Sequence, residues 1–160
     1  MSDKKLNALL SKALSIVAVA FEGKFDRGGV PYFMHCYQVM MNLKTDDIEL
    51  KIIAVLHDLI EDTDWTMEML RSEGFSERIL AGLSLMTRDH HDKSDEAYDV
   101  YIHAIATSYD ATRVKLADLE HNMDPSRVKG KEEKHKKLLT KYERSHKYLS
   151  IKRTEYEAKI

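Results

Sequence analysis

Helix-breaking residues are scarce in this chain, and that scarcity restricts its fold more than any other feature. Proline occurs only at positions 31 and 125, and the 160 residues include six glycines. Apolar side chains recur at helical spacing over residues 6–20, and no stretch alternates β-branched and polar residues as a half-buried strand does. The sequence therefore predicts an all-α fold.

Helix starts can be placed from capping signals. Thr45 precedes two aspartates, and Ser76 precedes Glu77; hydroxyl groups cap free amides at a helix start, and acids favour its positive dipole end. A first helix ends before a loop at residues 23–31. The remaining helices are predicted over residues 32–43, 46–60, 66–73, 76–86, 94–108, 110–123 and 131–158.

Composition indicates one globular domain spanning residues 1–160. Hydrophobic residues make up 43% of the chain and charged residues 32%, a balance typical of a protein with a real core. The single cysteine, Cys36, excludes an internal disulfide and fits the cytoplasm. The apolar stretch at residues 13–21 is too short to cross a bilayer and is interpreted as part of a core helix.

Residues 57–62, HDLIED, carry the clearest functional signal. His57, Asp58, Glu61 and Asp62 follow the apolar run 52–56, so ionisable groups emerge from a segment that should be buried. Buried carboxylates are costly unless a positive charge pairs with them, and a divalent cation meets that need. The alternative is a helix end with solvated charges.

Two further residues complete a candidate metal site between core helices. His35 lies on the preceding predicted helix, and Asp118 lies within an apolar helical pattern downstream. With His57 and Asp58 they supply two imidazoles and two carboxylates, a set that suits Mn²⁺, Fe²⁺, Mg²⁺ or Zn²⁺. Cys36 is either a further ligand or a small buried side chain.

The order of these motifs resembles the HD-domain metal-dependent phosphohydrolases. The segments RGGVPYFMH at 27–35, HDLIEDT at 57–63 and VKLADLEHNM at 114–123 are most similar to the hydrolase domain of RelA/SpoT enzymes and to the small Mesh1-like alarmone hydrolases. The resemblance covers roughly residues 5–125 and implies a single HD-domain helical bundle.

The resemblance also implies a reaction. Members of this family use Mn²⁺ to hydrolyse the 3′-pyrophosphate of ppGpp or pppGpp, which gives GDP or GTP and pyrophosphate. Within that family, the positions of Glu61 and Asp62 are assigned to catalysis. Either residue can instead serve only to orient a ligand histidine.

The same resemblance implies that five residues contact the substrate: Arg27, Lys93, Asn122, Arg144 and Tyr148. Arg27 can equally be an exposed loop residue, and Asn122 a helix-terminal residue without a ligand. Arg144 and Tyr148 form the C-terminal pair, and other residues could take their role instead: Lys137, Lys141 and Tyr142.

Some features lie outside the family pattern or carry no assigned role. Asp124 and Pro125 stand where the family commonly has a basic residue, and Arg127 can replace that charge. His90 and His91 suggest a second metal site or, as the simpler interpretation, surface histidines. His103 is expected at the edge of the core and His121 in solvent.

The C-terminal segment 127–160 is basic, with 12 Lys and Arg residues against 5 Asp and Glu. Interspersed acids and apolar residues favour an amphipathic helix packed on the domain over a nucleic-acid-binding tail. The expected partner is a phosphorylated nucleotide substrate, and binding to a membrane or to nucleic acid is not expected. The sequence is compatible with a homo-oligomer. Two other functions compete: hydrolysis of another nucleotide, such as the NADPH 2′-phosphate or a cyclic nucleotide, and nucleotide binding without catalysis.

Overall fold

The fold is all-α, as predicted. A computed structural model describes residues 1–89, 91–127 and 133–160, and these residues form helices without a β-strand. The helices are α1 Asp3–Ala20, α2 Tyr32–Asn42, α3 Ile48–Leu56, α4 Leu59–Asp62, α5 Met67–Ser72, α6 Glu77–Met86, α7 Asp95–Ile105, α8 Tyr109–Asn122, the 3₁₀ helix η1 Pro125–Arg127, and α9 Glu133–Glu157. None of the described helices is long and apolar enough to cross a membrane.

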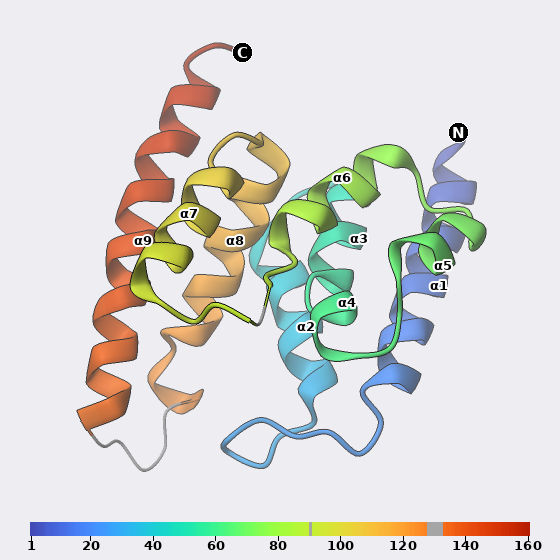
Figure 1. Ribbon diagram of the computed structural model, residues 1–160. Coiled ribbons are helices and arrows are strands. Elements are labelled where there is room, and N and C mark those ends of the chain that lie inside the picture. The colour runs from blue at the N-terminus through green and yellow to red at the C-terminus, as the bar shows by residue number, and fades with distance from the viewer. Residues whose placement is uncertain (90, 128–132) are drawn as a thin grey trace.

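Helix α3 forms the centre of the bundle. It packs against α1, α2, α6 and α8, while α9 runs along α8 at the opposite side of the molecule from α1 (Figure 1). All residues from Ile52 to Leu56 are buried, because this helix is covered on every side. Gly82 allows α6 to approach, since a Cβ atom there would lie 2.9 Å from Ile53 Cδ1.

The capping signals hold at α6 and shift slightly at α3. The Ser76 side chain accepts a hydrogen bond from the Ile79 amide, as expected of an N-cap. At α3 the cap is Asp47, which accepts from the Leu50 amide, and Thr45 Oγ1 instead accepts from the Asp47 amide at 3.1 Å.

The continuous helix predicted over 46–60 is wrong, because the structure divides it into α3 and α4. The break falls at His57 and Asp58; Asp58 has φ −100° and ψ −2°, which departs from regular helix geometry. The Nδ1 atom of His57 lies 2.6 Å from the Ala54 carbonyl oxygen, within the last turn of α3. The HD pair therefore lies at a helix junction rather than on one helix face.

The loop before α2 is held in a defined shape. Asp26 Oδ1 accepts hydrogen bonds from the amides of Gly28 and Val30, both at 2.9 Å, and Gly29 has φ +81°, a conformation that suits glycine. Arg127 Nη1 of η1 lies 3.6 Å from Asp26 Oδ2. This loop and the end of α8 are therefore joined beside the site described next.

Candidate metal centre

Four side chains from three parts of the bundle meet in its interior. His35 comes from α2, His57 and Asp58 from the α3–α4 junction, and Asp118 from α8. His35, His57 and Asp118 are almost fully buried, and the Asp58 side chain is 15% exposed. The three core helices thus bring together the residues that the sequence set apart.

The donor atoms converge. Asp118 Oδ1 lies 3.0 Å from His35 Nε2 and 3.3 Å from His57 Nε2. Asp58 Oδ2 lies 3.0 Å from His57 Nε2 and 3.5 Å from His35 Nε2. In His35, His57 and Asp58, one ligand atom of each residue lies within 4.8 Å of the others, a spacing at which they can hold a metal ion.

His57 has the orientation expected of a metal ligand. Its Nδ1 atom is 2.6 Å from the Ala54 carbonyl oxygen, which accepts a hydrogen bond from the Nδ1–H tautomer. Its Nε2 atom is buried and has no hydrogen-bond partner among the described residues. A buried polar atom without a partner is costly, and a metal ion would satisfy it.

The charges of the cluster are strongly coupled. Burial alone would lower the pKa of His57, but the neighbouring carboxylates of Asp58 and Asp118 outweigh it and raise that pKa well above its usual value. Burial would raise the pKa of both aspartates; His57 lowers that of Asp58, and Lys115 lowers that of Asp118 most strongly. Both acids are therefore ionised at neutral pH, as a cation site requires.

Two supporting residues were not predicted from the sequence. Tyr32 OH donates to Asp58 Oδ2 at 2.7 Å, and Lys115 Nζ donates to Asp118 Oδ2 at 2.8 Å. Lys115 takes the Asp118 oxygen that does not face the histidines, whereas Tyr32 binds the same Asp58 oxygen that lies near both histidines. The available signals were the position of Tyr32 three residues before His35 and that of Lys115 one turn before Asp118.

His121 does not face solvent, contrary to expectation. Its Nδ1 atom lies 2.8 Å from Nδ1 of His35, and the two rings stack with an interplanar angle of 13°. Burial, His35 and Arg127 lower the pKa of His121 to about 4, so its ring is neutral at pH 7 and can accept a hydrogen bond from His35. That tautomer of His35 directs a lone pair on Nε2 towards the carboxylates.

The donor set fits a divalent ion. Two imidazole nitrogens and two carboxylate oxygens suit Mn²⁺, Fe²⁺, Mg²⁺ or Zn²⁺, and the hydrogen bonds to Tyr32, Lys115 and His121 hold the ligands in orientation. The Cys36 thiol is buried, and burial raises its pKa, which opposes the thiolate needed for coordination.

The two proposed catalytic acids lie beside the centre on α4. Glu61 Oε1 accepts a hydrogen bond from the Arg88 amide at 2.9 Å. Asp62 is exposed, and its carbonyl oxygen accepts from Lys24 Nζ at 2.8 Å. Both acids line an open cavity of about 530 Å³ together with Lys24 and Trp65. Their catalytic roles stay a prediction.

The proposed substrate contacts differ in their distance from the centre. Asn122 Nδ2 donates to Asp118 Oδ1 at 3.1 Å, so this residue touches a metal ligand. Arg27 is exposed on the loop before α2, and Lys93 is exposed on the segment before α7. Each of these roles stays a prediction.

The C-terminal pair is directed elsewhere. Arg144 Nη2 pairs with Asp99 of α7 at 3.1 Å, and the Tyr148 ring meets His103, which is exposed, edge-on at 4.9 Å. The structure therefore does not bring Arg144 and Tyr148 together with the metal ligands. Among the competing residues, Tyr142 is partly buried; burial raises its pKa, and Lys115, Asp118 and Arg27 lie near enough to affect it.

Of the two histidines that suggested a second metal site, His91 is the one among the described residues. His90 lies outside the described residues, and His91 is exposed, with its amide donating to Asp89 Oδ1 at 2.9 Å. Two further residues compete with the C-terminal pair for substrate binding. Both lie on α9, where Lys137 is exposed and Lys141 is half-buried.

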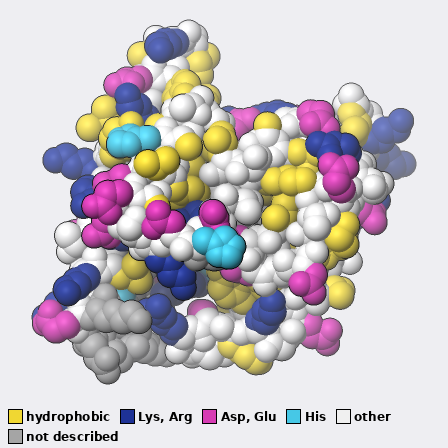
Figure 2. Space-filling model, viewed as in Figure 1, with side chains coloured by type: hydrophobic (Ala, Val, Ile, Leu, Met, Phe, Trp, Pro, Cys, Tyr) yellow, Lys and Arg dark blue, Asp and Glu magenta, His cyan; other side chains and the backbone are white. Residues whose placement is uncertain are grey.

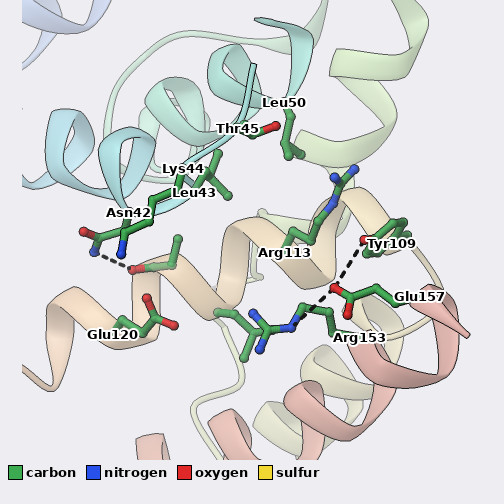
Figure 3. Close-up of a pocket in the computed structure, with 12 residues that line it drawn as sticks. Asn42, Leu43, Lys44, Thr45, Leu50, Tyr109, Arg113, Glu120, Arg153 and Glu157 are labelled. Carbon is green, nitrogen blue, oxygen red and sulfur yellow. Dashed lines mark hydrogen bonds and ion pairs between the residues drawn. The ribbon is translucent and has the colours of Figure 1, made fainter. Parts of the chain in front are cut away.

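A separate cavity of about 260 Å³ lies on the other side of α8 (Figure 3). Leu116 and Ala117 line it, whereas Lys115 and Asp118 project from the opposite helix face. Several of its polar residues bond within the chain: Tyr109 OH donates to Glu157 at 3.4 Å, and Asn42 Nδ2 donates to the Ala117 carbonyl at 3.4 Å. None of the proposed site residues lines this cavity.

No protein-family model matches the chain, but individual relatives do. It is 35% identical over 113 residues to a guanosine-3′,5′-bis(diphosphate) 3′-pyrophosphohydrolase of Haemophilus influenzae, covering 65% of this chain and 16% of the relative. It is 34% identical over 103 residues to the zebrafish (Danio rerio) protein of that name, MESH1, covering 61% of this chain and 57% of the relative.

A solved structure shares the fold. It comes from a study describing a metazoan orthologue of SpoT that hydrolyses ppGpp, and it matches with a TM-score of 0.75 at 22% identity, over 91% of this chain and 92% of that one. The chain spans less than a fifth of the length of the bacterial relatives that it matches.

Proposed function

Because this chain is homologous to the SpoT and MESH1 hydrolases, we propose that it hydrolyses the 3′-pyrophosphate of ppGpp or pppGpp to yield GDP or GTP and pyrophosphate. The observation that carries the proposal is the convergence of His35, His57, Asp58 and Asp118 on one buried point, with Glu61 adjacent. This arrangement is the one that metal-assisted phosphate chemistry needs.

The ion proposed for this site is Mn²⁺, held by His35, His57, Asp58 and Asp118. When bound, such an ion lowers the pKa of a water molecule and neutralises charge on a phosphoryl oxygen. The surroundings of the site favour binding of this ion, because they keep both aspartates ionised and because Ala54 and His121 fix the histidine tautomers.

Glu61 is the proposed base for the attacking water. Its carboxylate is held by the Arg88 amide at 2.9 Å, one helical turn beyond Asp58, so its position is set by backbone rather than by a flexible side chain. Asp62 is proposed to hold or protonate the ribose 3′ oxygen as it leaves phosphorus. Its exposure at the cavity wall gives it access to a substrate atom.

Asn122, Arg27 and Lys93 are proposed to bind the nucleotide. Asn122 is an amide at the edge of the metal centre and can turn from Asp118 to a ribose hydroxyl. Arg27 lies on a loop that Arg127 joins to the end of α8, and a guanidinium there can stack on a purine or bind phosphate. Exposed Lys93 supplies a cation for a phosphate.

Product analysis over a nucleotide panel tests the proposal. Metal-loaded protein is incubated with ppGpp, pppGpp, NADPH and a cyclic nucleotide, and the products are separated by ion-exchange chromatography. We expect GDP or GTP with pyrophosphate from the first two. Release of phosphate from NADPH alone would retain the metal centre but assign another substrate, and binding without turnover would mean that the protein is not an enzyme.

A further inference from the structure

Two cationic side chains from distant parts of the chain meet on one tyrosine ring. The Arg88 guanidinium, from the segment between α6 and α7, lies 5.2 Å from the centre of the Tyr98 ring, and Lys141 Nζ of α9 lies 3.8 Å from it. Tyr98 is buried, and its hydroxyl accepts a hydrogen bond from Ser145 Oγ at 3.2 Å. A fixed ring thus supports both cations.

Asp92 and Asp95 lie near enough to affect the charges of this pair, but neither forms an ion pair with it among the described residues. Within residues 1–89, 91–127 and 133–160, neither Arg88 nor Lys141 lies within 4.0 Å of a carboxylate oxygen. Burial and the nearby Arg88 lower the pKa of Lys141, and Asp95 raises it by less; the two cations therefore repel each other. An anion between them would relieve that repulsion.

Arg88 of this pair is connected to the metal centre through two further side chains. Arg88 also lies 5.2 Å from the Tyr101 ring, and Lys115 Nζ lies 5.3 Å from the same ring while it donates to Asp118. The amide of Arg88 holds Glu61. Arg88 is therefore separated from a metal ligand by the Tyr101 ring and Lys115, and it belongs to the segment that positions the proposed base.

Figure 2 shows Lys and Arg side chains gathered around a hollow near the middle of the face on which α7 and α9 lie. We propose that Arg88 and Lys141 form an anion subsite that binds the outer phosphate of the 3′-pyrophosphate group. This inference rests on the proposed function, which places the inner phosphate at the metal. The outer phosphate then extends away from the metal and requires its own counter-charge.

The choice of side chains suits this role. A guanidinium stacked on aromatic rings keeps its hydrogen-bonding edge available, and its planar shape fits a phosphate with two parallel hydrogen bonds. Contact with the rings of Tyr98 and Tyr101 also orders the side chain before substrate arrives, so less conformational freedom is lost on binding. The subsite thereby distinguishes a pyrophosphate from a single phosphate.

The test uses metal-loaded full-length protein and the variants Arg88→Gln and Lys141→Gln. Lys147→Gln is the matched control, because Lys147 is an exposed cation of the same helix α9. Arg88→Lys tests whether charge alone restores the function. Steady-state kinetics with ppGpp give KM and kcat separately, and calorimetric titration with inorganic pyrophosphate and inorganic phosphate measures binding without turnover.

We expect each Gln variant to raise KM for ppGpp and weaken pyrophosphate binding by roughly tenfold or more, which is the loss of one charge-assisted hydrogen bond. Phosphate binding and kcat should change less, Lys147→Gln should match the wild type, and Arg88→Lys should recover part of the affinity. Unchanged KM and pyrophosphate affinity in both variants would overturn the subsite, as would a fall in kcat and thermal midpoint with KM unaffected.

The two proposals fail in different ways. If the wild type does not hydrolyse ppGpp, the proposed function fails, whatever the variants do. If the wild type hydrolyses ppGpp and the Gln variants bind pyrophosphate as tightly as the Lys147→Gln control, only the subsite fails.

Discussion

Two clusters in this protein gather carboxylates from separate helices, and they do so for different ends. At the surface, Arg78 of α6 meets Asp47 at 2.6 Å, Asp110 at 2.8 Å and Glu49 at 3.1 Å. In the interior, Asp58 and Asp118 meet two histidines at 3.0–3.5 Å. The first cluster consists of charges of opposite sign, whereas the second directs donor atoms towards a common point.

The two clusters differ in solvent exposure and therefore in how much their charges affect stability. The Arg78 side chain is 37% exposed and its partners 22–30% exposed, so each pair is screened by water and contributes modestly. The side chains of the metal centre are 2–15% exposed, where charges are expensive to desolvate. The surface cluster ties α3, α6 and α8 together, whereas the buried cluster is costly in stability, as expected of a site that serves the proposed chemistry.

Removing a carboxylate should give the largest difference between the two clusters in metal content and activity. Asp58→Ala should lose bound metal and activity together, beyond the roughly 10³-fold that loss of one transition-state donor costs. Asp47→Ala, the matched change in the surface cluster, should retain both. Metal content by mass spectrometry and turnover of ppGpp check this, and an active, metal-loaded Asp58→Ala protein would contradict the ligand assignment.

Glu61→Gln tests the division of labour at the centre itself. This variant preserves the shape of the side chain but removes its ability to take a proton, so kcat should fall by roughly 10²-fold or more while metal content stays at the wild-type level. The same metal and turnover measurements apply. Loss of the ion from Glu61→Gln would show that Glu61 is a ligand, not a base.

Chelation should destabilise the protein through the buried cluster alone. At a free metal concentration of 100 Kd, binding adds about 2.7 kcal/mol to the free energy of unfolding, or a rise of roughly 5–10 °C in Tm for a chain of this size. Scanning calorimetry with and without chelator measures the difference, and Arg78→Gln should show the same increment as the wild type.

Metal affinity should also rise with pH. Because the carboxylates of Asp58 and Asp118 raise the pKa of His57, a metal that binds its Nε2 atom competes with a proton for that atom. Titrations in buffers of different ionisation enthalpy report proton release. Binding that is independent of pH would contradict this competition.

Arg78→Gln is expected to give the smallest effect, a loss of about 1–2 kcal/mol in the free energy of unfolding at neutral pH. Burial would raise the pKa of Asp47, but Arg78 outweighs it and lowers that pKa; hydrogen bonds from Arg78 also lower that of Asp110. The stabilisation is therefore present above the unfolded-state pKa of about 3.9 and is lost as pH falls through the lowered folded-state values.

Urea unfolding at a series of pH values measures this change. The difference between wild type and Arg78→Gln should shrink on acidification below about pH 4. A difference that stays constant down to acid pH would mean that Arg78 stabilises the protein by packing and not through its carboxylate partners.

Much of the fold follows from local sequence signals. Apolar periodicity and capping located the helices to within a few residues, because α1, α3, α5, α6, α7 and α8 each begin after a Ser, Thr or Asp whose side chain caps them. The break between α3 and α4 was not predicted, since it depends on tertiary packing around His57 and Asp58 and no proline or glycine marks it.

The site could be predicted in part, for a related reason. Ligand residues appear as ionisable groups within apolar runs, so His57 and Asp118 could be found from the sequence alone. The supporting contacts join positions 26 and 86 residues apart, as in Tyr32–Asp58 and His35–His121, and no local pattern reports such pairs. For the same reason His121 was expected in solvent.

We propose that the buried cluster holds a metal that enables hydrolysis of the alarmone pyrophosphate. The most direct test is incubation of purified, metal-stripped protein with ppGpp, with and without added Mn²⁺, followed by ion-exchange separation of the products. We predict GDP and pyrophosphate only in the presence of Mn²⁺. Intact ppGpp in both reactions, with Mn²⁺ shown to be bound, would contradict the claim.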